Sequence, residues 1–322
     1  MVNTNTPGEG ISTPEPARKA LVVATHNGVF HADDVFAVAA IMLVCPSATV
    51  VRTRDPKVLE TAAVVIDVGG ISDGQVNRFD HHQKGGAGVR ANGVPYAAFG
   101  LVWAHTGWVW DVLGTLCSNV DDWAHIQRKV DERLVQAIDA ADNGFVMEGD
   151  VRNTPAFTVS QVISGFNPTW DEDTAFDEAF GAAVTLAKAI ITRAVKAAVA
   201  EVAAEAAVAA ALRDDESRHC TGVLVLEKFV PWTDALLRLD TGRSKFVVFP
   251  AETGDWRIQA VPDAPGSFGM RKPLPESWAG LRGADLVEKT GVSDAIFCHN
   301  GRFIAGAQSR EGIMKMALQA IA

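Results

Sequence analysis

Short apolar runs alternate with stretches of helical spacing in the first half of the chain. Residues 20–25 (ALVVAT) form an apolar, β-prone run that ends in polar residues, and residues 34–44 follow with Val, Ala, Ile and Leu at helical spacing. The alternation continues with strands predicted at 48–52 and 62–68 and helices at 97–104 and 132–141. This pattern predicts an α/β fold in which helices flank a parallel sheet, whose ligands gather at the carboxyl ends of the strands.

The second half has a different pattern. Residues 174–213 are dominated by Ala, Val, Glu, Lys and Arg, with no Pro, which predicts one long helix or a helical pair. Beyond them, β-prone runs separated by turn residues predict a smaller α+β domain, with strands at 222–226, 245–249, 256–261 and 295–298. We therefore expect a flexible tail at 1–17, a first domain at 18–173, a connecting helical segment at 174–213 and a second domain at 214–322.

Length, charge and cysteine spacing exclude several classes of protein. At 322 residues and 48% hydrophobic content, the chain is long enough for about two globular domains with real cores. No apolar run reaches the ~18 residues needed to cross a bilayer, and residues 1–16 lack the pattern of a signal peptide. The four cysteines are far apart with no CxxC pair, which favours reduced thiols and a cytoplasmic protein. A net charge of −10 argues against a protein that grips long nucleic acid through many phosphates, but permits a small or end-bound anionic substrate.

His and Asp residues follow the predicted strands of the first domain. They occur in residues 25–34 (THNGVFHADD), at Asp67 after the apolar run VVI, in the tripeptide Asp80-His81-His82, and in residues 139–145 (DAADNGF) where a helical pattern stops. Each residue alone has a structural explanation, such as a helix cap or a turn. Together, imidazoles and carboxylates at strand ends are the mixed ligand set of a first-row divalent metal, and there are enough of them for two ions.

These motifs, in this order, resemble the four motifs of the DHH phosphoesterase superfamily. More closely, the chain resembles the melanocyte-proliferating-gene family of DHH-like proteins, regarded as 3'-5' RNA exonucleases and formerly labelled metal-dependent protein hydrolases. The resemblance runs from Val22 onward through THNGVFHADD, VRTRDP, VIDVGG, RFDHHQ, GLVWAHTG, IDAADNG, LVLEKFVPW, WRIQAVPDAPGSFGMRKPLPESWAGLR and FIAGAQSREGIMKMA. It implies a DHH-type domain with a parallel sheet flanked by helices, a long linker helix and a smaller α+β C-terminal domain.

The resemblance also implies roles for individual residues. One metal would be held by His26, His31 and Asp67, and the other by Asp33, Asp67, His81 and Asp142, with Asp67 as the bridge. His82 would face the substrate phosphate, and Asp80 would orient the neighbouring imidazoles. The usual superfamily loop has an Asp at the position of His31, so metal preference can differ here. The expected cofactor is a pair of divalent ions, manganese in the first place, with Mg, Co or Zn as alternatives.

The second domain supplies candidates for substrate recognition. Arg suits bidentate phosphate contacts and Trp suits base stacking, although each residue alone has a structural alternative as a solvated charge or a core aromatic. The candidate contacts are Lys228, Arg257, Arg271, His299 and Arg310, together with Trp232, Trp256, Lys272 and Arg282. Arg271 is favoured because the resembled family carries a basic residue there, and the superfamily's C-terminal domain binds substrate opposite the metals.

The sequence therefore predicts a metal-dependent phosphodiester hydrolase that cleaves RNA or short oligonucleotides from an end. Two alternatives stay open. One is a phosphatase or pyrophosphatase acting on a small nucleotide, and the other is a metal-binding interaction protein without turnover. We expect no membrane partner, and a homo-oligomer is compatible with the sequence.

Overall fold

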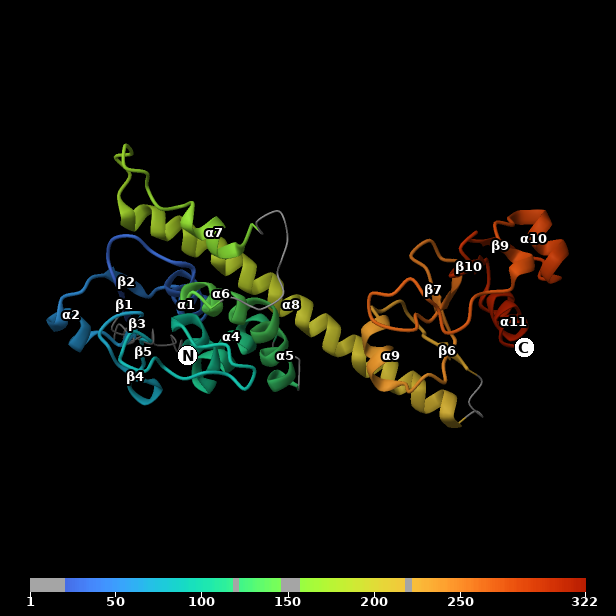
Figure 1. Cartoon of the computed structure of the whole chain (residues 1–322), viewed down its shortest axis with the longest axis horizontal. Helices are drawn as coiled ribbons and strands as arrows, with labels where there is room; N and C mark the ends of the chain where they lie inside the picture. The colour runs from blue at the N-terminus through green and yellow to red at the C-terminus, as the bar shows by residue number, and fades with distance from the viewer. Residues whose placement is uncertain (1–20, 118–121, 146–156, 218–221) are drawn as a thin grey trace, which may run out of the picture. The chain divides into compact units, whose positions relative to one another are not determined.

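The computed structural model describes residues 21–117, 122–145, 157–217 and 222–322 (Figure 1). The chain divides into two compact units, with the boundary between Lys196 and Ala197. This boundary falls within helix α8 (Phe176–Ser217), a single helix of 42 residues. Each unit has a five-stranded sheet of its own.

The sheet of the first unit has the strand order β2-β1-β3-β5-β4. Strands β1 (Val22–Thr25), β2 (Thr49–Arg52) and β3 (Val64–Ile66) are parallel to one another, as predicted, and β5 (Arg78–Phe79) is parallel to β3. The edge strand β4 (Ser72–Asp73) is antiparallel to β5, so the sheet is mixed and not purely parallel. Strands β4 and β5 were missed by the sequence prediction because two residues each are too few for an alternating pattern.

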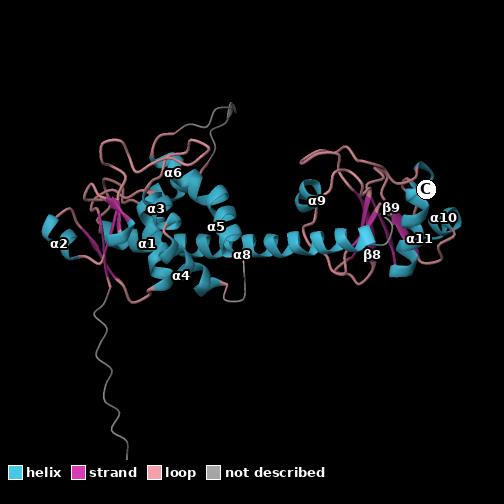
Figure 2. Ribbon diagram, turned by 90° about the horizontal axis from the view of Figure 1, so that it is seen from below, coloured by secondary structure: helices cyan, strands magenta, loops and turns pink. Residues whose placement is uncertain are grey.

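Helix α1 (Ala32–Val44) lies at the centre of the helical layer of the first unit. Its first ten residues are all buried, which agrees with a sequence that is apolar on nearly every side. It contacts α3, α4, α6 and α7, and Figure 2 shows it beside α3 and α4. The remaining helical segments are α2 (Pro56–Thr61), α3 (Ala98–Ala104), α4 (Thr106–Leu116), α5 (Trp123–Val130), a π-helical turn (Asp131–Val135), α6 (Gln136–Asp142) and α7 (Val159–Ser164), with a 3-10 turn at Gly74–Val76.

The sheet of the second unit has the order β6-β7-β8-β10-β9. Its side chains alternate between two cores: Phe246 and Val248 of β7 pack in one core with residues of α10 and α11, while Val247 and Phe249 pack in the other with residues of α8 and α9. This alternation is the period of two expected for a strand buried on both faces. The elements are β6 (Val223–Val225), α9 (Thr233–Leu239), β7 (Phe246–Pro250), β8 (Trp256–Ala260), a 3-10 turn (Glu276–Trp278), α10 (Gly283–Thr290), β9 (Ala295–Cys298), β10 (Ile304–Ala307) and α11 (Arg310–Ile321).

The predicted fold class, α/β with a long helix and a smaller α+β second unit, is confirmed. Strands β6, β7, β8 and β9 lie within or close to the predicted apolar runs. Strand β10 was missed because its sequence, IAGA, has low β-propensity apart from the isoleucine. In the described part of the chain, no helix has the length and apolar character needed to cross a membrane.

Candidate metal centre

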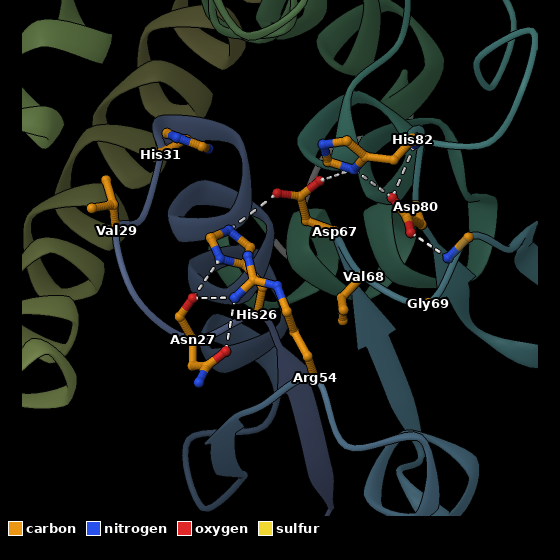
Figure 3. Close-up of a pocket in the computed structure, with 11 residues that line it drawn as sticks. His26, Asn27, Val29, His31, Arg54, Asp67, Val68, Gly69, Asp80 and His82 are labelled. Atoms are coloured by element: carbon orange, nitrogen blue, oxygen red, sulfur yellow. Dashed lines mark hydrogen bonds and ion pairs between the residues drawn. The ribbon is translucent and has the colours of Figure 1, made fainter.

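Three neighbouring strands of the first sheet deliver the polar residues of the site to one edge. His26 directly follows β1, Asp67 directly follows β3, and Asp80-His81-His82 directly follow β5. These strands are adjacent and parallel, so their carboxyl ends meet, as the sequence pattern predicted. Figure 3 shows the side chains of His26, Asp67 and His82 around a common cavity.

Asp67 has a left-handed backbone, with φ of 55°. Among residues with a side chain, Asp and Asn adopt this conformation most readily, and such conformations gather at functional sites. The backbone N–H of Asp67 donates to the carbonyl oxygen of Phe79 at 3.0 Å, which ties the end of β3 to β5. The carboxylate is buried, and its two oxygens face imidazoles on either side.

Helices α1 and α6 bring further carboxylates to this edge. Asp33, in the first turn of α1, accepts a hydrogen bond from the backbone N–H of Ala98 at 3.2 Å. Asp142 is the last residue of α6. His31, at the amino end of α1, has an exposed side chain whose Nδ1 lies 3.8 Å from Asp142 Oδ1.

The short distances between these groups centre on Asp67 and Asp142. His26 Nε2 lies 3.4 Å from Asp67 Oδ2, whereas His81 Nε2 lies 3.2 Å from Asp67 Oδ1 and 3.1 Å from Asp142 Oδ2. Asp33 Oδ2 is 3.7 Å from His81 Nε2. Three groups of side chains have ligand atoms close enough to share an ion: His26, His31 and Asp67; Asp67, His81 and His82; and His31, Asp33 and Asp142.

Several buried polar atoms of this cluster have no hydrogen-bond partner within the described part of the chain. They are His26 Nε2, Asp33 Oδ1, Asp34 Oδ2, Asp67 Oδ1 and His81 Nε2. A buried polar atom without a partner costs free energy, so proteins rarely retain such a concentration without a ligand. A pair of divalent cations would satisfy imidazole nitrogens and carboxylate oxygens together, and the residues present therefore fit the metals that the sequence predicted.

The pKa values reflect close packing of opposite charges. Burial by itself would raise the pKa of Asp67, but the close imidazoles of His26 and His81 lower it to about 2. Burial would lower the pKa of His81, but its contacts with Asp142 and Asp67 raise it to about 10. The pKa of Asp33 is raised, first by burial and then by the charges of Asp67 and Asp142. The cluster thus holds more negative charge than its imidazoles balance.

Asp34 has contacts in the site that the sequence did not predict. Its Oδ1 accepts hydrogen bonds from the backbone N–H groups of His31 and Val35, which fits the helix-terminus role considered from the sequence. Its Oδ2 lies 3.3 Å from His26 Nε2, so the same carboxylate also faces a candidate ligand. Burial raises the pKa of Asp34 to about 7 although the nearby His26 lowers it.

Asp80 contacts the ring of His82. Its Oδ1 lies 2.8 Å from His82 Nδ1, and its Oδ2 accepts from the backbone N–H of Gly70 at 2.5 Å. The side chain of His82 is 60% exposed and opens onto the cavity, whereas that of His81 is 7% exposed. His82 Nδ1 is also 3.4 Å from Asp67 Oδ1, so the geometry brings both imidazoles of the tripeptide to the cluster.

Arg54 lines the same cavity and was not predicted as a site residue. It follows β2, and its Nη1 donates to Asn27 Oδ1 at 2.7 Å and to the backbone oxygen of Asn27. Figure 3 shows its side chain reaching along the wall of the cavity. The sequence signal was available, because this arginine lies in VRTRDP, two residues after the end of a predicted strand.

A buried ionic network links α6, which carries Asp142, to α3, which contacts Asp33. Arg90 donates to both carboxylate oxygens of Asp131 and to Asp139 Oδ2 at 2.8 Å. Asp139 Oδ1 accepts from the backbone N–H of Gly100 at 3.0 Å. The network therefore connects α3, whose Ala98 bonds Asp33, to α6, which ends at Asp142.

Five of the recognition candidates of the second unit have different environments. The guanidinium of Arg271 donates to Asp240 Oδ2 at 2.6 Å and to Ser244 O at 3.0 Å. The other arginines also have partners: Arg257 pairs with Asp255 and Arg310 with Glu227. Lys228 and His299 are exposed, and His299 packs its ring against Phe303. Their roles in substrate binding stay predictions.

Comparison with known proteins gives the family of the chain. The family model MYG1_exonuc, described as an uncharacterised protein family (UPF0160), matches residues 22–321. Human MYG1 exonuclease is 33% identical over an alignment that covers 98% of this chain and 90% of the human protein. Mouse MYG1 exonuclease is 34% identical, with 93% of this chain and 84% of the mouse protein covered. The MYG1 protein of Dictyostelium discoideum is 29% identical, with 94% of this chain and 96% of that protein covered.

Among solved structures, RecJ from Thermus thermophilus in complex with Mn2+ aligns at 14% identity, covering 93% of this chain and 51% of RecJ. The TM-score of 0.24 is too low to transfer its fold or its metal. The sequence relatives are decisive, since the matched segment includes all candidate ligands and extends almost to the carboxyl terminus. The relatives from human and mouse are named exonucleases, which are hydrolases. By this match, the chain belongs to the MYG1 exonuclease family.

Proposed function

We propose that this chain is a divalent-metal-dependent phosphodiester hydrolase, a 3'-5' exonuclease that acts on RNA or short oligonucleotides in the cytoplasm. The observation that supports it best is the set of buried imidazole and carboxylate atoms without hydrogen-bond partners around Asp67, in a chain whose relatives are exonucleases. A site for a single structural ion would not require ligand atoms on both sides of one carboxylate.

We assign the ligands to two sets, and the short distances around Asp67 and Asp142 support this assignment. His26, His31 and Asp67 hold one ion, and Asp33, Asp67, His81 and Asp142 hold the other, with Asp67 between them. Two divalent cations against three carboxylates leave a charge of about +1 with neutral imidazoles, which attracts an anionic phosphodiester. When bound, the ions lower the pKa of a bound water to near neutrality and stabilise charge on the attacking and leaving oxygens. Manganese is the first expectation, with Mg, Co and Zn as alternatives.

The residues around the ligands position the substrate. Asp80 accepts the Nδ1–H of His82, so His82 Nε2 is directed toward the cavity, where it contacts a phosphate oxygen. Arg257, Arg271, Lys228, His299 and Arg310 are the proposed contacts of the second unit with the rest of the substrate.

The test is hydrolysis of short 5'-labelled RNA and DNA by the full chain in the presence of Mn, Mg, Co or Zn. We expect a ladder of products shortened from the 3' end, and no ladder after chelation or with Asp67→Asn. Release of phosphate from a nucleoside bisphosphate without cleavage of a trinucleotide would identify a phosphatase instead. Metal binding without turnover of either substrate would identify a metal-binding interaction protein.

A further inference from the structure

A second cavity adjoins the candidate metal centre within the first unit. Its volume is about 490 Å³, similar to the 480 Å³ of the cavity that contains His26, Asp67 and His82. Apolar side chains make up much of its lining. The lining residues are Arg54, Pro56, Leu59, Glu60, Val65, Val68, Gly69, Ile71 and Arg78.

The two cavities share part of their walls. Arg54, Val68 and Gly69 line both of them. Figure 3 shows these three residues on the side of the metal cavity below Asp67. The second cavity contains none of the candidate metal ligands, so it offers a different chemical environment directly beside them.

Gly69 keeps this shared wall thin. Its φ of 97° is accessible to glycine at low cost, and an added Cβ would lie 3.7 Å from Leu59 Cδ1. Any longer side chain would extend toward Leu59 and Val65 and fill the cavity. The buried side chain of Val65 lines the bottom of the cavity, and Leu59 and Val68 pack against the same small apolar cluster.

The polar groups of the second cavity lie among these apolar side chains. Arg78 is held in place because its guanidinium donates to the backbone oxygens of Val76 and Ala62. Arg54 uses Nη1 for Asn27, and within the described residues the structure gives no acceptor for its Nη2 or Nε. Glu60 supplies a carboxylate acceptor. An apolar cavity with a few polar groups is typical of a site for a flat organic group.

We infer that this second cavity binds the nucleobase of the nucleotide whose phosphate lies at the metal centre. A nucleotide carries an anionic phosphate and an apolar-faced base a few ångströms apart, which matches a cationic centre that shares a wall with an apolar cavity. The base packs between the aliphatic side chains and the guanidinium of Arg54, which also reaches the phosphate side. Bases stack on guanidinium planes as well as on aromatic rings. This inference rests on the proposed function, and it separates a nucleotide substrate from inorganic pyrophosphate, which would leave the second cavity empty.

The test is a binding comparison with the full chain in the presence of Mn2+. Isothermal titration calorimetry would compare a nucleoside 5'-monophosphate, the product of 3'-5' hydrolysis, with 1-O-methylribose 5-phosphate, which lacks the base. We expect the nucleotide to bind about tenfold more tightly, near the lower part of the range for a stacked base. Ile71→Asp, which places a charge at the cavity, should remove this difference.

Val76→Asp is the matched control, because the side chains of Val76 and Ile71 are 55% and 52% exposed and Val76 does not line the cavity. Since neither side chain is buried, both variants should fold, and circular dichroism on heating checks this. Equal affinities of the wild type for the two ligands, no binding of either, or an unchanged ratio in Ile71→Asp would overturn the inference. Hydrolysis of RNA together with any of these results would leave the proposed function standing. Base-dependent binding without hydrolysis of any oligonucleotide would support the base site and overturn the exonuclease activity.

Discussion

Asp67 combines imidazole contacts on both oxygens of its carboxylate with a strained backbone conformation. Its oxygens face His26 on one side and His81 on the other, and its backbone is left-handed. Asn accepts this backbone conformation as Asp does, so Asp67→Asn changes the charge with little effect on the chain path.

We therefore expect Asp67→Asn to lose bound manganese at both positions and to lose hydrolysis, because the bridging charge also offsets repulsion between the ions. Metal analysis after gel filtration measures the manganese content. Two equivalents of retained manganese with near-normal hydrolysis would contradict the assignment of Asp67 as the bridge.

His81 and His82 allow a direct comparison between a buried and an exposed imidazole. His81→Ala should reduce metal content, because His81 Nε2 lies within 3.7 Å of three carboxylates. His82→Ala should reduce turnover with metal content nearly unchanged, because Asp80 directs that ring toward the cavity. An ion lost only in His82→Ala would reverse the two roles, whereas an ion lost in both variants would favour the alternative set of Asp67, His81 and His82.

At the scale of elements, the packing of α3 on α6 depends on a glycine. Ala normally stabilises a helix relative to Gly, but a Cβ at Gly100 would collide with the carboxylate of Asp139 and lie 2.7 Å from Arg90 Nη2. We expect Gly100→Ala to lower the free energy of unfolding by about 1–3 kcal/mol, and to weaken manganese binding because α3 and α6 position Asp33 and Asp142.

Gly181→Ala in α8 is the control for this prediction. No atom lies within 4 Å of a Cβ built there, so the substitution should stabilise the protein by roughly 0.5–1 kcal/mol. Chemical denaturation of both variants measures whether the free energy of unfolding rises or falls. A stabilised Gly100→Ala would show that the network of Arg90 and Asp139 moves away at low cost.

Arg271 fixes the segment between α9 and β7. Its guanidinium bonds Asp240, whose buried carboxylate also accepts from the backbone N–H groups of Arg243 and Ser244. Burial would raise the pKa of Asp240, but these donors lower it. Arg271→Ala removes the closer of the two guanidinium groups beside this carboxylate, with Arg243 Nε remaining at 3.7 Å. We therefore expect a loss of about 1.5–3 kcal/mol in unfolding free energy, and Arg271→Lys should recover only part of it.

The lowered pKa of Asp240 also predicts how the stability of the protein depends on pH. A carboxyl group whose pKa is lower in the folded state stabilises the protein above its unfolded pKa, and that stability is lost as the pH falls through the folded pKa. The wild type should therefore lose stability on acidification below about pH 4 more steeply than Arg271→Ala. Unchanged unfolding with a fall of one to two decades in kcat/KM would instead support the role of Arg271 as a phosphate contact.

At the scale of the whole molecule, the candidate ligands all belong to the first unit. Metal binding stabilises the state that binds, so manganese at about 100 times its Kd should add about 2.7 kcal/mol to the unfolding free energy of that unit. Scanning calorimetry with manganese and with EDTA measures the shift. We expect manganese to raise the Tm of the first unit and to leave the Tm of the second unit unchanged. An equal rise in the Tm of Asp67→Asn would argue against the site.

Much of the fold could be predicted because hydrophobic periodicity is a local property. The apolar run before Asp67 and the spacing of α1 were sufficient for a strand and a helix, and the Ala-rich segment became the single helix α8. Elements with weak local signals were missed: β4 and β5 are two residues long, and β10 is held in the sheet by its pairing with β8 and β9.

The sequence by itself determined the types of ligand and their positions at strand ends, because parallel neighbouring strands bring their carboxyl ends to one edge. Only the tertiary structure decided which atoms meet there. The contact between Asp34 and His26, the position of Arg54 on a wall shared by two cavities, and the pairing of Arg271 with Asp240 join residues through loops and helix ends. Such contacts depend on loop paths and side-chain rotamers, which leave no periodic pattern in a sequence.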